Sequence, residues 1–199
     1  MTKKKNDLWG ILVILVVIIL FFGFVAVEKI IKDNKYVEND YNKFQFFYDE
    51  NQEIWYTQIQ IGNVPYNIPF YYHPRDLKDV VVEPDIENII LLKRPENIII
   101  TVPGDSSSQL ALAGIEVSKI TGTRFQVLKI PTASALNEPI TGMPYATCES
   151  ANEKTVVISF EKSKNNVIRS ENRCIILEFK DNESVRVADT FVFHLLKIM

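Results

Sequence analysis

The chain begins with an unbroken apolar run over residues 8–27, twenty positions without a charged or strongly polar side chain. At about 1.5 Å of rise per residue, a helix of this length spans about 30 Å, which matches the hydrocarbon core of a bilayer. A helix in a soluble core would show polar positions every three or four residues, because one of its faces meets water. The run therefore predicts a transmembrane anchor over residues 8–27, preceded by a tail over residues 1–7.

A cleaved signal peptide is the alternative interpretation of this run. Signal peptides carry apolar stretches of about 7–15 residues, followed by small residues at the cleavage site. The stretch here is longer, and bulky Phe24 stands two positions before Ala26, where cleavage requires a small side chain. We therefore expect an uncleaved, single-pass signal-anchor that holds the chain in the lipid bilayer.

The residues after the run divide into a stalk and one globular domain. Residues 28–42 are charged and lack proline and glycine, which favours a juxtamembrane stalk that prolongs the helix. The domain is expected over residues 43–199. It opens with three aromatic and β-branched runs, at 44–48, 53–61 and 66–72, separated by turn-forming residues, which predict an antiparallel β-meander. Short helices are expected after His73 and between residues 84 and 90.

The second part of the domain has a different pattern. Asn97–Val102 (NIIITV) is a continuous apolar run, typical of a strand buried on both faces. Serine hydroxyls at 106–108 are expected to cap a helix over residues 109–120, which ends at Gly122. The apolar run at 125–130 is expected to return as a parallel strand, so that the three elements form a right-handed βαβ unit.

Three more apolar runs, at 155–160, 166–169 and 174–179, predict further strands. A last helix, capped by Asp181, Asn182 or Ser184, is expected to dock its apolar face against the domain up to Met199. The expected fold class is α+β or α/β: an N-terminal transmembrane helix, then an antiparallel meander, then a βαβ-containing mixed sheet with two main flanking helices.

Basic residues alone do not orient the anchor, because three lysines precede it and three follow it closely. Glu28 and Asp33 dilute the charge after the run, and the α-amino group adds to the charge before it. We therefore expect the N-terminus in the cytoplasm and the domain on the outer side of the cell membrane. From residue 36 onward, acidic side chains outnumber basic ones by about six. Such a surface repels phosphate backbones, so no nucleic acid is expected as a partner.

The two cysteines, Cys148 and Cys174, both fall in the domain. An even count in an oxidising compartment favours a disulfide bond, and two buried free thiols are the alternative. The spacing excludes a CxxC redox pair.

Three residues are candidates for a catalytic site. Asp105 and Ser106 lie between a strand and a helix N-terminus, whose unpaired N–H groups attract anions, although the segment lacks a phosphate-loop motif and a well-capped helix is the simpler interpretation. His73 ends the third run, where it could act as a general base. The second histidine, His194, falls in the apolar last helix. The spacing of these groups offers no metal site, and no cofactor motif is found.

Two further features concern the surface. The sequence holds more aromatic rings than one small sheet face can bury, and we take Trp55, Tyr56, Tyr71 and Tyr72 as a candidate binding surface for a protein or glycan of the envelope. The alternative is that these rings pack under the short helices. Asn182 begins an N-x-S tripeptide, an acceptor for glycosylation in an external domain, with helix capping as the competing explanation.

Several phrases together carry a resemblance to a known group of proteins. They are the lysine-led anchor, YNIPFYYHPRDL at residues 66–77, the cysteine pair with ENRCIILEF, and the ending RVADTFVFHLLKIM at residues 186–199. The chain resembles small, uncharacterised single-span membrane proteins of DPANN archaea over most of its length. This resemblance implies an archaeal envelope protein, and it transfers no activity and no site residues.

The leading functional expectation is a membrane-anchored external domain that binds or assembles through its aromatic surface and is not an enzyme. A membrane-tethered hydrolase or transferase with a site near His73, Asp105 and Ser106 is the first alternative. An accessory subunit of a membrane complex is the second.

Overall fold

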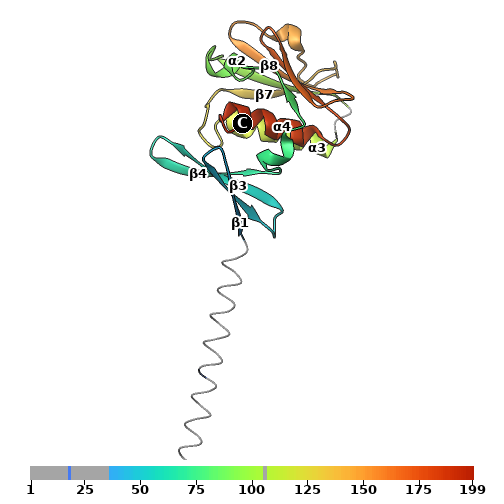
Figure 1. Ribbon diagram of the computed structural model, residues 1–199. Coiled ribbons are helices and arrows are strands. Elements are labelled where there is room, and N and C mark those ends of the chain that lie inside the picture. Colours follow the sequence, from blue (N-terminus) through green and yellow to red (C-terminus); the bar gives the residue numbers. More distant parts are fainter. Residues whose placement is uncertain (1–17, 19–35, 105–106) are drawn as a thin grey trace, which may run out of the picture.

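The computed structural model describes residue 18 and residues 36–104 and 107–199. These residues form two β-sheets with two helices between them, so the domain has three layers (Figure 1). The predicted anchor at 8–27 lies outside the described residues except for Ile18. Within the described part of the chain, no helix is both long and apolar enough to cross a bilayer.

The first sheet is the predicted antiparallel meander, with one strand more than expected. Its strands are β1 (Tyr36–Tyr41), β2 (Phe44–Asp49), β3 (Ile54–Ile61) and β4 (Val64–Phe70), in that order across the sheet. Residues 36–41 were expected in the stalk, and instead they pair with the whole of β2. Asn42 and Lys43 both have positive φ, at 46° and 72°, which gives the tight turn that joins two antiparallel strands.

The second sheet is mixed and has six strands in the order β5-β9-β10-β8-β6-β7. Strands β6, β7, β8 and β10 run parallel, and β9 is antiparallel to β10. The elements of this part are η1 (Pro74–Leu77), β5 (Val81–Val82), α2 (Asn88–Leu91), β6 (Asn97–Val102), α3 (Ser108–Thr121), β7 (Thr132–Leu136), η2 (Cys148–Ser150), β8 (Thr155–Lys162), β9 (Val167–Glu171), β10 (Cys174–Phe179) and α4 (Ser184–Leu195). The mixed α+β fold and the parallel βαβ unit are therefore confirmed.

The return strand of the βαβ unit lies later than expected. Residues 125–130 are not a strand, because Gln126 and Lys129 both have a φ of 58°, which an extended strand cannot contain. The backbone of this segment instead bonds back to the end of α3, where Leu128 N–H donates to the Ile120 carbonyl. Its apolar side chains pack against the core, which accounts for the hydrophobic pattern.

The predicted N-terminal cap of α3 is confirmed, and the predicted N-terminal cap of α4 is wrong. At α3 the Ser107 hydroxyl accepts the Leu110 N–H, and the helix ends at Gly122, as expected. At α4 the N-cap position belongs to Glu183, whose side chain forms no capping bond, rather than to Asp181, Asn182 or Ser184. The chain end docks as predicted, because Ile198 is buried and its N–H donates to the Phe193 carbonyl.

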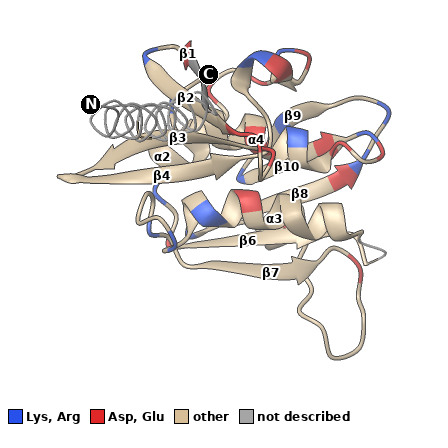
Figure 2. Cartoon of the chain, turned by 90° about the horizontal axis from the view of Figure 1, so that it is seen from below, with Lys and Arg blue, Asp and Glu red and all other residues tan. Residues whose placement is uncertain are grey.

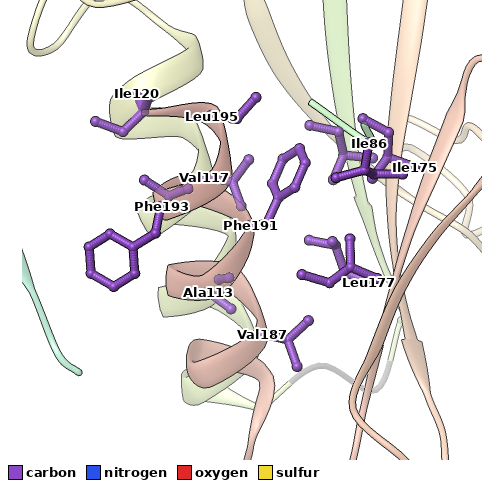
Figure 3. Close-up of a cluster of buried hydrophobic side chains, with 14 of the residues drawn as sticks. Ile86, Ala113, Val117, Ile120, Ile175, Leu177, Val187, Phe191, Phe193 and Leu195 are labelled. Atoms are coloured by element: carbon purple, nitrogen blue, oxygen red, sulfur yellow. The ribbon is translucent and has the colours of Figure 1, made fainter. Parts of the chain in front are cut away.

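Helix α4 is buried on both sides, since it lies between the two sheets. Phe191 points toward Ile175 and Leu177 of β10, whereas Phe193 points the opposite way (Figure 3). The Phe193 ring lies 4.4 Å from the ring of Phe70 in the meander. One helix therefore supplies core side chains to both sheets, while α3 packs beside it.

A buried ionic cluster joins the helices to the end of the meander. Helix α3 carries two charged residues, Glu116 and Lys119 (Figure 2). These two side chains pair with each other, and Lys119 also donates to the carbonyl of Pro69 in β4. Asp189 of α4 accepts the N–H groups of Tyr71 and Tyr72 at 3.0 Å each. Burial, and then the negative charge of Glu116, raise the pKa of Asp189 well above its ordinary value of 3.8.

This pKa shift predicts a pH-dependent stability. A carboxyl group that keeps its proton more tightly in the folded state contributes fully below its unfolded pKa, and the contribution is lost as the pH rises through the folded pKa. We expect the free energy of unfolding to fall on this account by up to about 1.4 kcal/mol per pH unit within that window.

Replacing Asp189→Asn keeps an acceptor for Tyr71 and Tyr72 and removes the titrating group. Urea unfolding monitored by circular dichroism between pH 5 and 9 should show a flatter profile for this variant than for the wild type. Asp181→Asn, at an exposed position before α4, is the control and should keep the wild-type slope. Parallel profiles for wild type and Asp189→Asn would contradict the assignment.

Candidate functional site

In the part of the chain that the structure describes, helices cover one face of the six-stranded sheet and leave the other open. Along β6, β8 and β10 the side chains alternate, so that Ile100, Ile158 and Leu177 face the helices and join the main core. The opposite face carries a small second core of Val157, Cys174 and Ile176, against which Ile99, Cys148 and Ala151 pack. This second face is where a site can open, because no helix layer closes it.

A short segment held by the disulfide crosses this open face. Cys148 in η2 is bonded to Cys174 at the start of β10, which confirms the predicted pair. Tyr145 bridges to Leu136 of β7. Strands β6 and β8 lie between β7 and β10, so residues 145–151, here called the strap, pass over them. The contact of η2 with β8 agrees with this path.

A polar cleft of about 530 Å³ lies beside the strap, toward the carboxyl ends of the parallel strands. In open α/β sheets, this end of the strands is where ligands bind. The polar residues that line the strap cleft are Asn137, Tyr145, Thr147, Glu149, Ser159, Glu161, Arg169 and Glu171. A second cleft of about 480 Å³ adjoins it at Cys148 and Glu149 and contains Glu153 and Arg173.

The charges in the strap cleft do not balance. The guanidinium group of Arg169 donates to Glu178 at 2.7 Å and to Glu171 at 2.5 Å, and these two carboxylates raise its pKa further above the ordinary value. Its positive charge is therefore already compensated. Glu161 accepts the Ser159 hydroxyl at 3.3 Å. Neither Glu161 nor Glu149 forms an ion pair with another described residue. The cleft is consequently anionic.

Two buried side-chain oxygen atoms near the cleft have no hydrogen-bond partner among the described residues, and the residue of one of them, Asn137, lines the cleft. They are Oγ1 of Thr101, a residue with no exposed surface, and Oδ1 of Asn137. Thr101 pairs with Ser159 in the parallel register, so its side chain lies on the open face beside a residue that lines the cleft. An unsatisfied buried polar group costs about 1–3 kcal/mol, so native proteins keep few of them.

The structure gives His73 a local role. The residue is only 2% exposed, its Nδ1 accepts the Arg75 N–H, and it forms the N-cap of η1. The rings of Trp55 and Phe46 lie 4.6 and 4.9 Å from its imidazole. Asp105 and Ser106, its proposed catalytic partners, lie outside the described residues, so the catalytic hypothesis stays a prediction.

The four aromatic residues of the expected binding surface do not share one exposed face. Trp55 and Tyr72 are half-buried and pack against the core, and the Tyr72 ring also lies against the guanidinium of Arg186. Tyr56 follows Trp55 in β3 and therefore points to the other face of the meander. Tyr71 is 38% exposed. Asn182 is exposed just before α4, and its glycosylation stays a prediction.

The sequence analysis did not single out the cleft residues. In β8 the polar positions Ser159 and Glu161 alternate with buried Ile158 and Phe160, a period of two that marks one partly polar face. That signal was available, but the strap and Asn137 come from an irregular stretch without periodicity. Within the described residues, no group of three or more histidine, cysteine or acidic side chains is placed to hold a metal ion.

Comparisons of this chain with known family models, curated proteins and solved structures find no match. The functional argument therefore depends on the geometry and charge of the strap cleft.

The disulfide should determine whether the strap stays in place. The bond closes a loop with a sequence separation of 26, and its loss is expected to lower the free energy of unfolding by about 3 kcal/mol in the chain-entropy model. Chemical denaturation of a Cys148→Ser, Cys174→Ser variant measures this change. Dithiothreitol should destabilise the wild type to the same extent and leave the variant unaffected. Equal stability of the oxidised wild type and the variant would contradict the role of the bond.

Proposed function

We propose that this chain is a non-catalytic binding domain, tethered to the outer side of a membrane, that holds its ligand or partner in the strap cleft. The observation that carries the proposal is the buried Oδ1 of Asn137, which has no hydrogen-bond partner among the described residues and belongs to the same cleft as the uncompensated Glu161. Buried polar groups without hydrogen bonds are costly, and in this fold they have already lost their contact with water. A second molecule that forms hydrogen bonds with them stabilises them without a further cost of removing them from water.

The chemistry of the cleft supports binding over catalysis. The residues that line it include neither a histidine nor a free thiol, and Cys148 is in the disulfide. The Ser159 hydroxyl, which is only 3% exposed, is donated to Glu161. The described lining residues therefore include no histidine–serine or histidine–cysteine pair of the kind that nucleophilic catalysis uses.

The proposed membrane tether is supported by the sequence, and the proposed external compartment is supported by the Cys148–Cys174 disulfide. The apolar run at 8–27 has the length of a bilayer span. Disulfides persist in oxidising compartments and are rare in the cytosol. A partner in the envelope, either a protein or a glycan, agrees with both features.

The topology can be tested by labelling single thiols in intact cells. In the Cys148→Ser, Cys174→Ser background, Lys164→Cys places a thiol at an exposed position of the domain. Thr2→Cys places one in the tail. A membrane-impermeant maleimide should label the first in intact cells and the second only after lysis. Labelling in the reverse order would overturn the proposed orientation, and labelling of both in intact cells would overturn the tether.

The location of binding can be tested with a photoreactive phenylalanine analogue in intact membranes. Tyr145 lines the strap cleft, whereas Tyr56 lies on the far face of the meander, which makes Tyr56 the matched control. Irradiation should give an adduct of defined mass at position 145 and none at position 56. An adduct at 56 alone would place binding on the aromatic meander instead. Its absence at both positions would contradict a binding function.

A further inference from the structure

We infer that the strap cleft takes a cationic group rich in N–H donors, an alkylammonium or a guanidinium. This inference rests on the proposed function and names the chemistry of the ligand. It follows from three features of the cleft: its net charge, the kind of hydrogen-bonding groups that lack partners, and an exposed aromatic ring.

The charge favours a cation. Arg169 is the basic residue among those that line the strap cleft, and its guanidinium group donates to two carboxylates of the protein, Glu171 and Glu178. Glu149 and Glu161 stay without a cationic partner among the described residues. An anionic ligand would meet two uncompensated carboxylates and a guanidinium already in use. A cationic ligand would restore neutrality at these two positions.

The unpartnered groups call for donors on the ligand. The amide oxygen of Asn137 and the carboxylate of Glu161, which both belong to residues lining the cleft, only accept hydrogen bonds. An ammonium group offers three N–H donors and a guanidinium offers five, so either can reach several acceptors at once. Hydrogen bonds between charged partners are also the stronger kind. A carboxylate or phosphate ligand could satisfy none of these acceptors.

Tyr145 supplies the third feature. Its side chain lines the cleft and is 54% exposed, so its ring is open to a ligand. The face of an aromatic ring attracts cations, an interaction that carboxylates lack. The cleft, at about 530 Å³, lies within the ordinary size range of small-molecule sites. A free diamine and a lysine side chain of a partner protein both present the chemistry in question.

The test uses the full-length chain in a non-ionic detergent and five-carbon probes of different charge. Cadaverine represents a free diamine, and Nα-acetyl-lysine methylamide represents a protein side chain. Glutarate and 1,5-pentanediol are the anionic and neutral counterparts. Isothermal titration should show binding of at least one ammonium probe, weakening with added salt, and no binding of glutarate or the diol. Which ammonium probe binds more tightly distinguishes the free amine from the lysine side chain.

Glu161→Gln should weaken binding of the ammonium probe by about tenfold or more, because it removes one charged acceptor. Glu153→Gln, which removes an equal charge in the adjoining cleft, is the matched control and should change the affinity less than twofold. Circular dichroism must show both variants folded. If Glu161→Gln is unfolded, Glu161→Asp replaces it and should weaken binding by shortening the reach of the carboxylate.

The outcomes separate the inference from the proposed function. Glu161-dependent binding of glutarate or the diol, with no binding of the ammonium probes, overturns the inference and leaves the binding function in place. A photo-adduct at position 145 without any ammonium binding does the same. Failure of every probe together with the absence of that adduct overturns both. Equal loss of affinity in Glu161→Gln and Glu153→Gln overturns the assignment to the strap cleft.

Discussion

The structure depends on the burial of α4 between the two sheets, whose described strands do not pair with each other. Phe191 packs against β10 and Phe193 against the ring of Phe70 in the meander, so one helix closes two hydrophobic layers at once (Figure 3). A helix that is apolar on most of its surface is stable only inside a protein or in a bilayer, and α4 lies inside the domain. The meander, which could not bury its own inner face, shares its core with this helix.

Hydrophobic burial is non-directional, so it does not by itself fix where the meander lies along the helices. The hydrogen bonds of the buried ionic cluster fix that position. Lys119 binds the carbonyl of Pro69, and Asp189 binds the N–H groups of Tyr71 and Tyr72, so the end of β4 is held at one place along the helices. These contacts also satisfy backbone groups that the chain leaves exposed after β4. Burying ionisable side chains is costly unless they are hydrogen-bonded, and here Lys119 and Asp189 both bond to the same short segment of backbone.

The candidate site follows from the one-sided placement of the helices. Because α3 and α4 both lie on the inner face, the strap is the part of the described chain that covers the outer face of the six-stranded sheet. The disulfide holds the strap over β6 and β8, and the polar ends of these strands remain beside it as a cleft. A second helix layer would have buried Glu161 and Arg169, and taking these charged groups out of water is costly. The polar residues at the ends of these strands therefore lie on the face of the sheet that the helices leave open.

The sequence by itself determined the elements with strong periodicity: the meander, the buried strand at residues 97–102, α3, α4 and the three C-terminal strands. Local pattern suffices there, because alternation and helical spacing report which faces are buried. It also indicated the cysteine pair by count. It misplaced β7 and missed β1, since an apolar segment can pack against a helix end as well as in a sheet, and a polar segment can pair as an edge strand. Only the tertiary structure decided that Asn137 and Glu161 line one cleft beside the strap, and that Glu116 and Lys119 of α3 lie near Asp189 of α4 in the core. Asn137 and Glu161, like the helices α3 and α4, are far apart along the chain, so these arrangements exist only after the sheets and helices have packed.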